Sequence, residues 1–352
     1  MTTLPNVLFL TPYYQSRRGN ATTARRLEAS MKRIGQPFTL FAYEEEPEAE
    51  GLAKLAEADV VHALHIRRTY EWLQLADTAL QMPYVLTSGG TDINVDIQQK
   101  QKAADLEAFV RQADRISVFS RDGVKKLDQA YPELSRHISI VPQGVDPAAA
   151  VHNNELSGWL QTHSGTPNIL IPAGLRSVKD VLFGLKVLEA LRVRFPSIQF
   201  MIVGEAMEET VKQEVVQAAE ARRWMHYHEG VEMELMPAFY EWADVVINTS
   251  LSEGQPMAVL EAMMHQIPVL ARRNGGNESV IQDGKNGLLF GDERTFHEQL
   301  EKLLDNPELK KKLTGQAKSD VLERHSSDKE ARQYQSIYKE ICHAGKEKDS
   351  SV

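Results

Sequence analysis

Residues 245–264 read VVINTSLSEGQPMAVLEAMM and join a short apolar run, a polar loop and a second apolar segment. The run at 245–247 predicts a buried strand, and the segment after Pro256 predicts a helix. Gly254 permits a close backbone approach or a positive φ, and Pro256 fits the first turn of a helix, where its missing N–H is not needed. The stretch therefore predicts a strand–loop–helix unit of the kind that builds parallel α/β sheets.

Two carboxylates lie in this unit, Glu253 in the loop and Glu261 about two turns into the helix. The free N–H groups and the dipole of a helix that starts at Pro256 would attract an anion, most naturally a phosphate. An ionised carboxylate only accepts hydrogen bonds, so each glutamate is suited to hold vicinal sugar hydroxyls. Two glutamates in an arbitrary loop and helix are more often solvated surface charges, and the surrounding Gly-x-Pro context favours the binding role.

The same alternation of short apolar runs and longer amphipathic segments continues along the whole chain and predicts an α/β protein with parallel strands. The expected strands lie at residues 7–10, 38–41, 60–64, 84–87, 115–119, 138–141, 168–172, 199–203, 225–228, 245–248, 268–271 and 287–290. The expected helices lie at residues 21–34, 180–195, 208–222, 236–242, 256–265 and 293–304, followed by a helical tail from 307 to about 346.

The pattern divides into two similar halves. We expect an N-terminal Rossmann-like domain at 1–150, a small and polar linker at 151–167, a C-terminal Rossmann-like domain at 168–310 and C-terminal helices at 311–352. Two such lobes imply a cleft between them. Ligands of open parallel sheets bind beyond the carboxyl ends of the strands, so these ends are the places to search for chemistry.

Composition excludes several classes of protein. The chain has 352 residues, 42% of them hydrophobic, which is ordinary for a globular protein of two or three domains. The net charge of −9 argues against a general nucleic-acid binder, and the single cysteine, Cys342, cannot form an intramolecular disulfide. The apolar run at 6–10 is too short for a signal sequence, and no run approaches the ~20 apolar residues of a membrane span. We therefore expect a cytoplasmic protein.

A second strand-to-helix segment, IPAGLRSVKD at 171–180, contains Arg176 and Lys179. Arginine as a bidentate fork and lysine as a mobile point charge suit a diphosphate, although a solvated basic loop explains the segment equally well by itself. Neither this loop nor the one at 253–256 matches Gly-x-Gly-x-x-Gly or a Walker loop, so the dehydrogenase and P-loop interpretations lose their main support.

The N-terminal half places polar residues after three expected strands. Gly19 and Asn20 follow the first, where Asn20 or Thr22 is also a candidate N-cap of the next helix. The third strand ends in HALHIRR at 62–68, where His65, just before Arg67 and Arg68 at the strand end, could donate or accept a proton near neutral pH. Thr91 and Asp92 follow the fourth and suit either hydroxyl contacts or a capped turn. A lone histidine is more often structural than catalytic.

The motifs in their order resemble the retaining glycosyltransferases of family 4, which have the GT-B fold. Glu253 and Glu261 form the Glu-x7-Glu pattern of that family. Three further parts follow its pattern, namely a phosphate-binding loop at 174–180, a base-binding strand end at 228–231 and closing loops at 275–289. The chain also resembles a narrower group, the glycosyltransferase 1 domain-containing proteins and the selenosugar synthases, through Gly19-Asn20, HIRR at 65–68 and GTD at 90–92.

The resemblance implies two Rossmann-like domains facing a cleft, with a C-terminal helix that crosses back to the N-terminal domain. Glu261 would bind the ribose, Glu253 the donor sugar, and Arg176 and Lys179 the diphosphate. Other donor-binding positions that it implies are Gly19, Asn20, Gly174, Gly230, Val231, Gly254, Gln255, Pro256 and Met257. Those implied on the acceptor side are His65, Arg67, Thr91 and Asp92.

The implied activity is the metal-independent and cofactor-independent transfer of a hexosyl group from a nucleoside-diphosphate sugar, a UDP-sugar by family frequency, to an unidentified acceptor. Its catalytic residues would be His65, Glu253, Arg176 and Lys179. Two alternatives stay open: a GT-B epimerase or hydrolase acting on the nucleotide sugar alone, and a non-catalytic protein that binds it.

The region of the first helix is locally basic through Arg17, Arg18, Arg25, Arg26, Lys32 and Arg33. Such a face either is solvated or attracts an anionic acceptor or a membrane surface. The oligomeric state is open.

Overall fold

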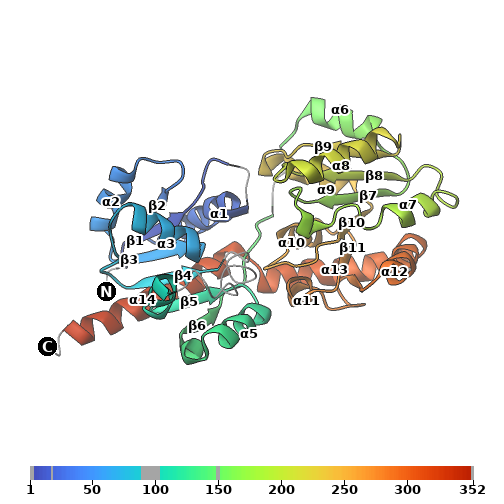
Figure 1. Cartoon of the computed structure of the whole chain (residues 1–352). Helices are drawn as coiled ribbons and strands as arrows, with labels where there is room; N and C mark the ends of the chain where they lie inside the picture. The colour runs from blue at the N-terminus through green and yellow to red at the C-terminus, as the bar shows by residue number, and fades with distance from the viewer. Residues whose placement is uncertain (1–3, 17–18, 89–103, 148–150, 350–352) are drawn as a thin grey trace. The chain divides into compact units, whose positions relative to one another are not determined.

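Two α/β units make up the chain, each with its own parallel sheet (Figure 1). The computed structural model describes residues 4–16, 19–88, 104–147 and 151–349. One unit comprises Met1–Gly144 together with Ser326–Val352, and the other comprises Val145–His325. The chain therefore passes between the units twice, after Gly144 and after His325.

In the first unit, the described residues form a six-stranded parallel sheet in the order β2-β1-β3-β4-β5-β6. Its strands are β1 (Val7–Thr11), β2 (Phe38–Ala42), β3 (Val60–Leu64), β4 (Tyr84–Thr87), β5 (Arg115–Val118) and β6 (Ile138–Ile140). Its helices are α1 (Gly19–Arg33), α2 (Glu48–Ala56), α3 (Ile66–Leu75), α4 (Ala104–Arg111), α5 (Arg121–Ala130) and α14 (Ser327–Asp349). β1 and β3 are buried at every position, because helices cover both faces of a parallel sheet.

The second unit repeats this design with the strand order β12-β11-β10-β7-β8-β9. Its strands are β7 (Asn168–Pro172), β8 (Gln199–Val203), β9 (Met225–His228), β10 (Val245–Asn248), β11 (Val269–Arg272) and β12 (Leu288–Phe290). Its helices are α6 (Asn154–Thr162), α7 (Leu185–Leu191), α8 (Glu209–Glu220), α9 (Met236–Trp242), α10 (Met257–Met264), α11 (Gly275–Val280), α12 (Glu293–Asp305) and α13 (Pro307–Arg324). Across the described residues, none of the helices combines the length and apolar character that crossing a membrane requires.

The expected strands are confirmed, and each ends within one residue of its expected position. The expected helix at 180–195 is wrong in length, because Asp180 adopts a left-handed φ of 44° and the regular helix is only α7. α1 begins at Gly19, so Asn20 and Thr22 lie in its first turn and neither is its N-cap.

The segments around the two crossings also differ from the expected division. Residues 151–167 contain α6, whose Leu156 and Leu160 enter the core of the second unit, so this stretch is not a plain linker. Of the C-terminal helices, α13 packs on α10 in the second unit, and α14 packs on α1 in the first.

A buried polar network secures α14 to the first sheet. His62 on β3 contacts the Tyr338 hydroxyl through Nδ1 and the Thr87 hydroxyl through Nε2, both at 2.6 Å. Tyr334, one turn before Tyr338, contacts the Ser117 hydroxyl at 3.1 Å. His62 is completely buried, and this burial lowers its pKa to about 3. The imidazole is therefore neutral and serves the packing of α14.

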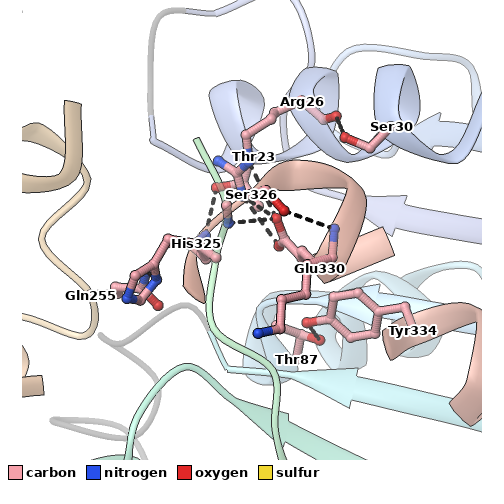
Figure 2. Close-up of polar contacts among 12 residues, drawn as sticks. Thr23, Arg26, Ser30, Thr87, Gln255, His325, Ser326, Glu330 and Tyr334 are labelled. Atoms are coloured by element: carbon pink, nitrogen blue, oxygen red, sulfur yellow. Dashed lines mark hydrogen bonds and ion pairs between the residues drawn. The ribbon is translucent and has the colours of Figure 1, made fainter. Parts of the chain in front are cut away.

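A buried ion pair ties the first crossing to α1 and α14 (Figure 2). Arg26 on α1 donates to both oxygens of Glu330 on α14 at 3.2 Å, and the Gly144 backbone N–H donates to Glu330 Oε2 at 2.8 Å. The two side chains are only 6% and 1% exposed. Gly144 also touches the α14 backbone so closely that a Cβ there would lie 2.4 Å from Ser327 Cα. These contacts place the segment before the crossing firmly within the first unit.

Removing Arg26 should destabilise the protein strongly. In Arg26→Met the apolar stem remains, but the Glu330 carboxylate stays buried without its counter-ion, at an expected cost of about 3 kcal/mol of unfolding free energy. Urea unfolding followed by circular dichroism measures this loss. The control is Arg33→Met, because Arg33 pairs with Asp328 on the surface and should cost under about 1 kcal/mol. Equal losses in the two variants would contradict the role given to Glu330.

His62 should make the stability depend on pH. Its folded pKa of about 3 lies below the ordinary 6.5, so the unfolded chain binds the extra proton as the pH falls below 6.5. The stability that His62 contributes is thus complete above pH 6.5 and decreases toward pH 3, by up to about 1.4 kcal/mol per pH unit. Urea midpoints of the wild type and His62→Gln between pH 7 and 4.5 test this. The wild type should lose more stability than the variant over that range, and parallel curves would contradict it.

Candidate functional site

The carboxyl ends of β7, β8, β9 and β10 bring most of the predicted donor residues into one part of the second unit. These neighbouring strands are all parallel, so the loops that follow them leave the same edge of the sheet. Arg176 and Lys179 follow β7, Gly230 follows β9, and Glu253 follows β10. Their common place follows from the topology.

Glu253 and Lys179 form a buried ion pair at the centre of this region. Lys179 Nζ lies 2.7 Å from Glu253 Oε1, and the glutamate is 9% exposed. The Ser250 hydroxyl and the Asn248 side-chain amide donate to the same oxygen at 2.6 and 3.1 Å. Burial alone would raise the pKa of Glu253, but the charge of Lys179 and these hydrogen bonds bring it below the ordinary value. The carboxylate is therefore ionised.

The second carboxylate oxygen of Glu253, Oε2, is the one that can accept a further hydrogen bond. All three of these hydrogen bonds go to Oε1, so Oε2 keeps its capacity to accept from a ligand hydroxyl. α11 packs closely against the loop, because a Cβ on Gly276 would lie 2.5 Å from Glu253 Cβ. This contact and the ion pair fix the orientation of the carboxylate before any ligand arrives.

A scaffold of asparagines supports the loop after β10. Asn277 Nδ2 donates to Asn248 Oδ1 at 3.1 Å and to the Arg272 carbonyl at 2.8 Å. Asn274 caps α11 and donates to the Ser250 carbonyl at 2.8 Å. The predicted closing loop at 275–278 is thus a wall of the Glu253 site.

Glu261 lies on α10 as the sequence predicts and is half-buried. The Tyr240 hydroxyl on α9 donates to Glu261 Oε2 at 2.6 Å. Burial raises the pKa of Tyr240 well above its ordinary value, and the charge of Glu261 adds to this effect. Tyr240 therefore stays protonated and orients the carboxylate by donating to it.

The loop after β7 is anchored on both sides. Glu208 accepts the Ser177 backbone N–H at 2.9 Å, and the Thr249 hydroxyl donates to the Lys179 carbonyl at 2.9 Å. Arg176 Nε is buried and has no hydrogen-bond partner among the residues that the structure describes. The loop is thus held in place while Arg176 retains donor capacity for an anion.

Gln255 and Pro256 are buried at the start of α10. Pro256 is the N-cap and Met257 the first helical residue, one position later than expected. Gln255 Nε2 lies 3.4 Å from Nδ1 of His325, the residue before the second crossing, as Figure 2 shows. The loop at 253–256 is therefore linked to the end of α13.

Close backbone contacts explain two glycines near the strand ends, and a third faces a side chain. A Cβ on Gly230 would lie 2.9 Å from the Glu205 nitrogen, and one on Gly204 would lie 2.0 Å from the Ala173 carbonyl oxygen. Gly174 faces the Met207 sulfur, at 3.1 Å from the place of a Cβ. Val231 is half-buried against the main core of the unit. The loops after β7, β8 and β9 therefore meet with little space between their backbones.

The segment at 283–289 has a structural role. Gly284 has a left-handed φ of 75° in its turn. Asn286 is buried and donates to Asp320 on α13 at 2.8 Å and to the Val280 carbonyl at 3.1 Å. These bonds fix α13 to the sheet of the second unit.

His65 lies in the first unit at the end of β3. It has an unusual left-handed backbone, with φ of 75° and ψ of 89°, and it is 7% exposed. Its Nδ1 is buried without a hydrogen-bond partner among the described residues, whereas both nitrogens of His62 are engaged. Backbone strain and an unsatisfied nitrogen are typical of functional positions. His65 as the acceptor-side residue stays a prediction.

The other N-terminal candidates are less informative. Arg67 pairs with Glu71 on the exposed side of α3 at 2.8 Å. Gly19 has open space around the position of a Cβ, so nothing in the structure requires glycine there. Asn20 is half-buried in α1. The predicted Thr91 and Asp92, like Arg17 and Arg18, lie outside the described residues.

Several basic side chains of α1 already have partners inside the first unit. Arg25 donates to the Ser16 carbonyl at 3.0 Å, Lys32 pairs with Glu28, and Arg33 pairs with Asp328. Arg26 is in the buried pair with Glu330. Attraction of a membrane or an anionic acceptor by this helix stays a prediction.

The sequence did not single out Asn248, Ser250, Tyr240 or Glu205. The first two directly follow the apolar run of β10, and polar residues at that place were the available signal. The sequence around Tyr240 gave no such signal, because the contact of Tyr240 with Glu261 depends on how α9 and α10 pack. Within the described ranges, no group of three or more His, Cys, Asp and Glu side chains is arranged to hold a metal ion.

Known proteins are similar to this chain in sequence and in fold. Residues 159–320 match the family described as Glycosyl transferases group 1. Glycosyltransferase 1 domain-containing protein 1 from Xenopus tropicalis is 27% identical over 344 residues, which cover 94% of this chain and 96% of the relative.

Solved structures agree with the architecture. Anabaena Alr3699/HepE in complex with UDP-glucose has a TM-score of 0.78 at 15% identity, covering 96% of this chain and 100% of that one. Sucrose-phosphate synthase from Thermosynechococcus elongatus has a TM-score of 0.73 at 16% identity, with coverages of 96% and 100%. These likenesses concern the fold. Residues 159–320 are thus similar to the glycosyl transferases group 1 family, and the two six-stranded parallel sheets with flanking helices have the GT-B fold.

Proposed function

We propose that this glycosyltransferase moves a hexosyl group from a nucleoside-diphosphate sugar, a UDP-sugar, to an acceptor hydroxyl with retention of the anomeric configuration, as in family 4. The bond from the anomeric carbon to the diphosphate oxygen breaks, and a bond to the acceptor oxygen forms. The acceptor proton ends on the released diphosphate. The observation that carries the proposal is the buried Lys179–Glu253 pair, which offers a fixed carboxylate oxygen beside a cation.

The two carboxylates would have separate tasks. Glu253 Oε2 accepts hydroxyl hydrogen bonds from the donor sugar, and Glu261, oriented by Tyr240, accepts those of the ribose. Neither attacks the sugar, so the two-carboxylate scheme of glycoside hydrolysis does not apply. Because both carboxylates are oriented by the protein, little reorganisation accompanies binding.

Cations of the same loop would stabilise the leaving group. Negative charge develops on the diphosphate as its bond to the sugar breaks. Arg176, with its unused Nε, and Lys179 would meet that charge, so we propose transfer without a metal ion or cofactor. His65, at a strained position in the first unit, is the proposed acceptor-side residue.

Diphosphate binding should depend on Glu261 and Arg176. Calorimetric titration without added metal, using UDP, GDP and ADP, should show tight binding of one nucleotide. Losing a hydrogen bond to a charged group costs about 1.5–3 kcal/mol, so Glu261→Ala and Arg176→Ala should each weaken binding roughly ten- to a hundredfold. Glu308→Ala, an exposed position on α13, is the control. If the folded wild type binds none of the three, the proposal is wrong.

Glu253→Gln should separate catalysis from nucleotide binding. Glutamine keeps the shape but removes the charge that meets Lys179, and the free nucleotide lacks the sugar that Glu253 would hold. We expect UDP release from the donor to slow at least about a hundredfold, while the Kd for UDP changes only a few-fold. Steady-state kinetics and titration measure the two quantities. An unchanged rate, or a rate loss matched by the loss in UDP affinity, would refute the role of Glu253.

An acceptor requirement separates the proposed transfer from the alternatives. Turnover of the sugar nucleotide without any acceptor would indicate an epimerase or hydrolase. Binding of the donor without turnover in a broad acceptor screen would indicate a binding protein.

A further inference from the structure

Glu205, the second residue after β8, carries an unsatisfied carboxylate oxygen. Its Oε2 is buried and has no hydrogen-bond partner among the described residues. A buried acceptor without a partner is unfavourable, and more so when the group is charged. Such groups are rare in native proteins and require an explanation.

The Tyr227 hydroxyl, which interacts electrostatically with Glu205, does not satisfy this oxygen, because it donates to the Gly204 carbonyl at 3.0 Å. The Glu205 backbone is engaged, because its carbonyl accepts the Leu175 N–H at 2.8 Å. The backbone is therefore fixed between two loops, while the side chain keeps its acceptor capacity.

The position of Glu205 connects it with the nucleotide. It follows β8, and the loop after β8 leaves the sheet at its carboxyl edge. The loops that carry Arg176, Lys179 and Glu253 leave the sheet at the same edge. The Glu205 backbone nitrogen lies against Gly230, 2.9 Å from where a Cβ would be. The resemblance to family 4 implies that the strand end at 228–231, with Gly230 and Val231, binds the base. An acceptor next to that backbone is well placed to meet the hydrogen-bonding edge of a base.

We propose that Glu205 determines base specificity by accepting a hydrogen bond from the ring N–H of the donor's nucleobase. This inference rests on the proposed function. Uracil has such an N–H at N3 and guanine has one at N1. Cytosine at N3 and adenine at N1 present a lone pair instead, which a carboxylate repels. Glu205 therefore selects nucleotides with a ring N–H and rejects those without one.

UDP and CDP form a matched pair for the test, because both have a pyrimidine, the same ribose and the same diphosphate. We expect the wild type to bind UDP at least about tenfold more tightly than CDP in calorimetric titration. In Glu205→Gln the ratio should fall toward one, because a glutamine amide can accept from uracil or donate to cytosine. The unfolding midpoint of the ligand-free variant should not decrease, since no native hydrogen bond of this carboxylate oxygen is lost.

Glu209→Gln is the control, because Glu209 is an exposed carboxylate four positions later that contacts Gln213. It should leave the UDP-to-CDP ratio unchanged. The inference is overturned if the wild type does not prefer UDP, or if Glu205→Gln keeps the wild-type ratio while Glu261→Ala still abolishes tight binding. Failure of the wild type to bind any nucleoside diphosphate overturns the proposed function as well.

Discussion

The loops of the second unit are arranged by one constraint, which is that the buried Glu253 side chain must stay ionised. A carboxylate that is only 9% exposed needs a counter-charge and hydrogen-bond donors, or it takes up a proton. Lys179 supplies the charge from the loop after β7, and Ser250 and Asn248 supply hydrogen bonds from the chain just before it. Satisfying one side chain therefore fixes two loops relative to each other. Asn277, through Asn248, adds α11 to the same assembly.

The first unit uses the same physics for a different purpose. Arg26 and Glu330 are even more deeply buried than Lys179 and Glu253, but their pairing holds α1, α14 and the chain at Gly144 together. The Glu330 oxygens are shared between Arg26 and a backbone N–H. A buried ion pair alone is therefore no sign of a ligand site. The difference is that Glu253 accepts these three hydrogen bonds at one oxygen, so the other oxygen can still accept a hydrogen bond.

Most of the fold could be predicted from the sequence, because strands buried on both faces give continuous apolar runs such as those at 60–64 and 245–247. The ends of helices were harder. Nothing in the residues 180–195 shows that Asp180 would be held by Arg272 with a left-handed backbone, which delays the start of α7. α6 was missed because its small and polar beginning is typical of a linker, while the burial of Leu156 and Leu160 depends on the rest of the unit. The sequence singles out four candidate site residues because each lies in a loop or in the first turns after an apolar run: Glu253, Glu261, Arg176 and Lys179. Tyr240 and Asn277 act through packing and could not be found in this way.

Hydrogen-bond satisfaction, combined with position, distinguishes structural from functional candidates of the same residue type. His62 and His65 are three residues apart on one strand and its end, and both are more than nine-tenths buried. His62 has hydrogen-bond partners at both ring nitrogens and faces α14, so neither nitrogen is left to bind a ligand. His65 has an unpartnered Nδ1 at the carboxyl end of the strand, where ligands of parallel sheets bind. Position is essential to this argument, because Trp242 Nε1 is also buried and unpartnered among the described residues, yet Trp242 ends α9 inside the core. Arg176 and Glu205 meet both conditions in the second unit, one offering a donor and the other an acceptor. Arg176 Nε and Glu205 Oε2 do not hydrogen-bond to each other. Both therefore keep their capacity for a ligand that has an anionic part and a hydrogen-donating part.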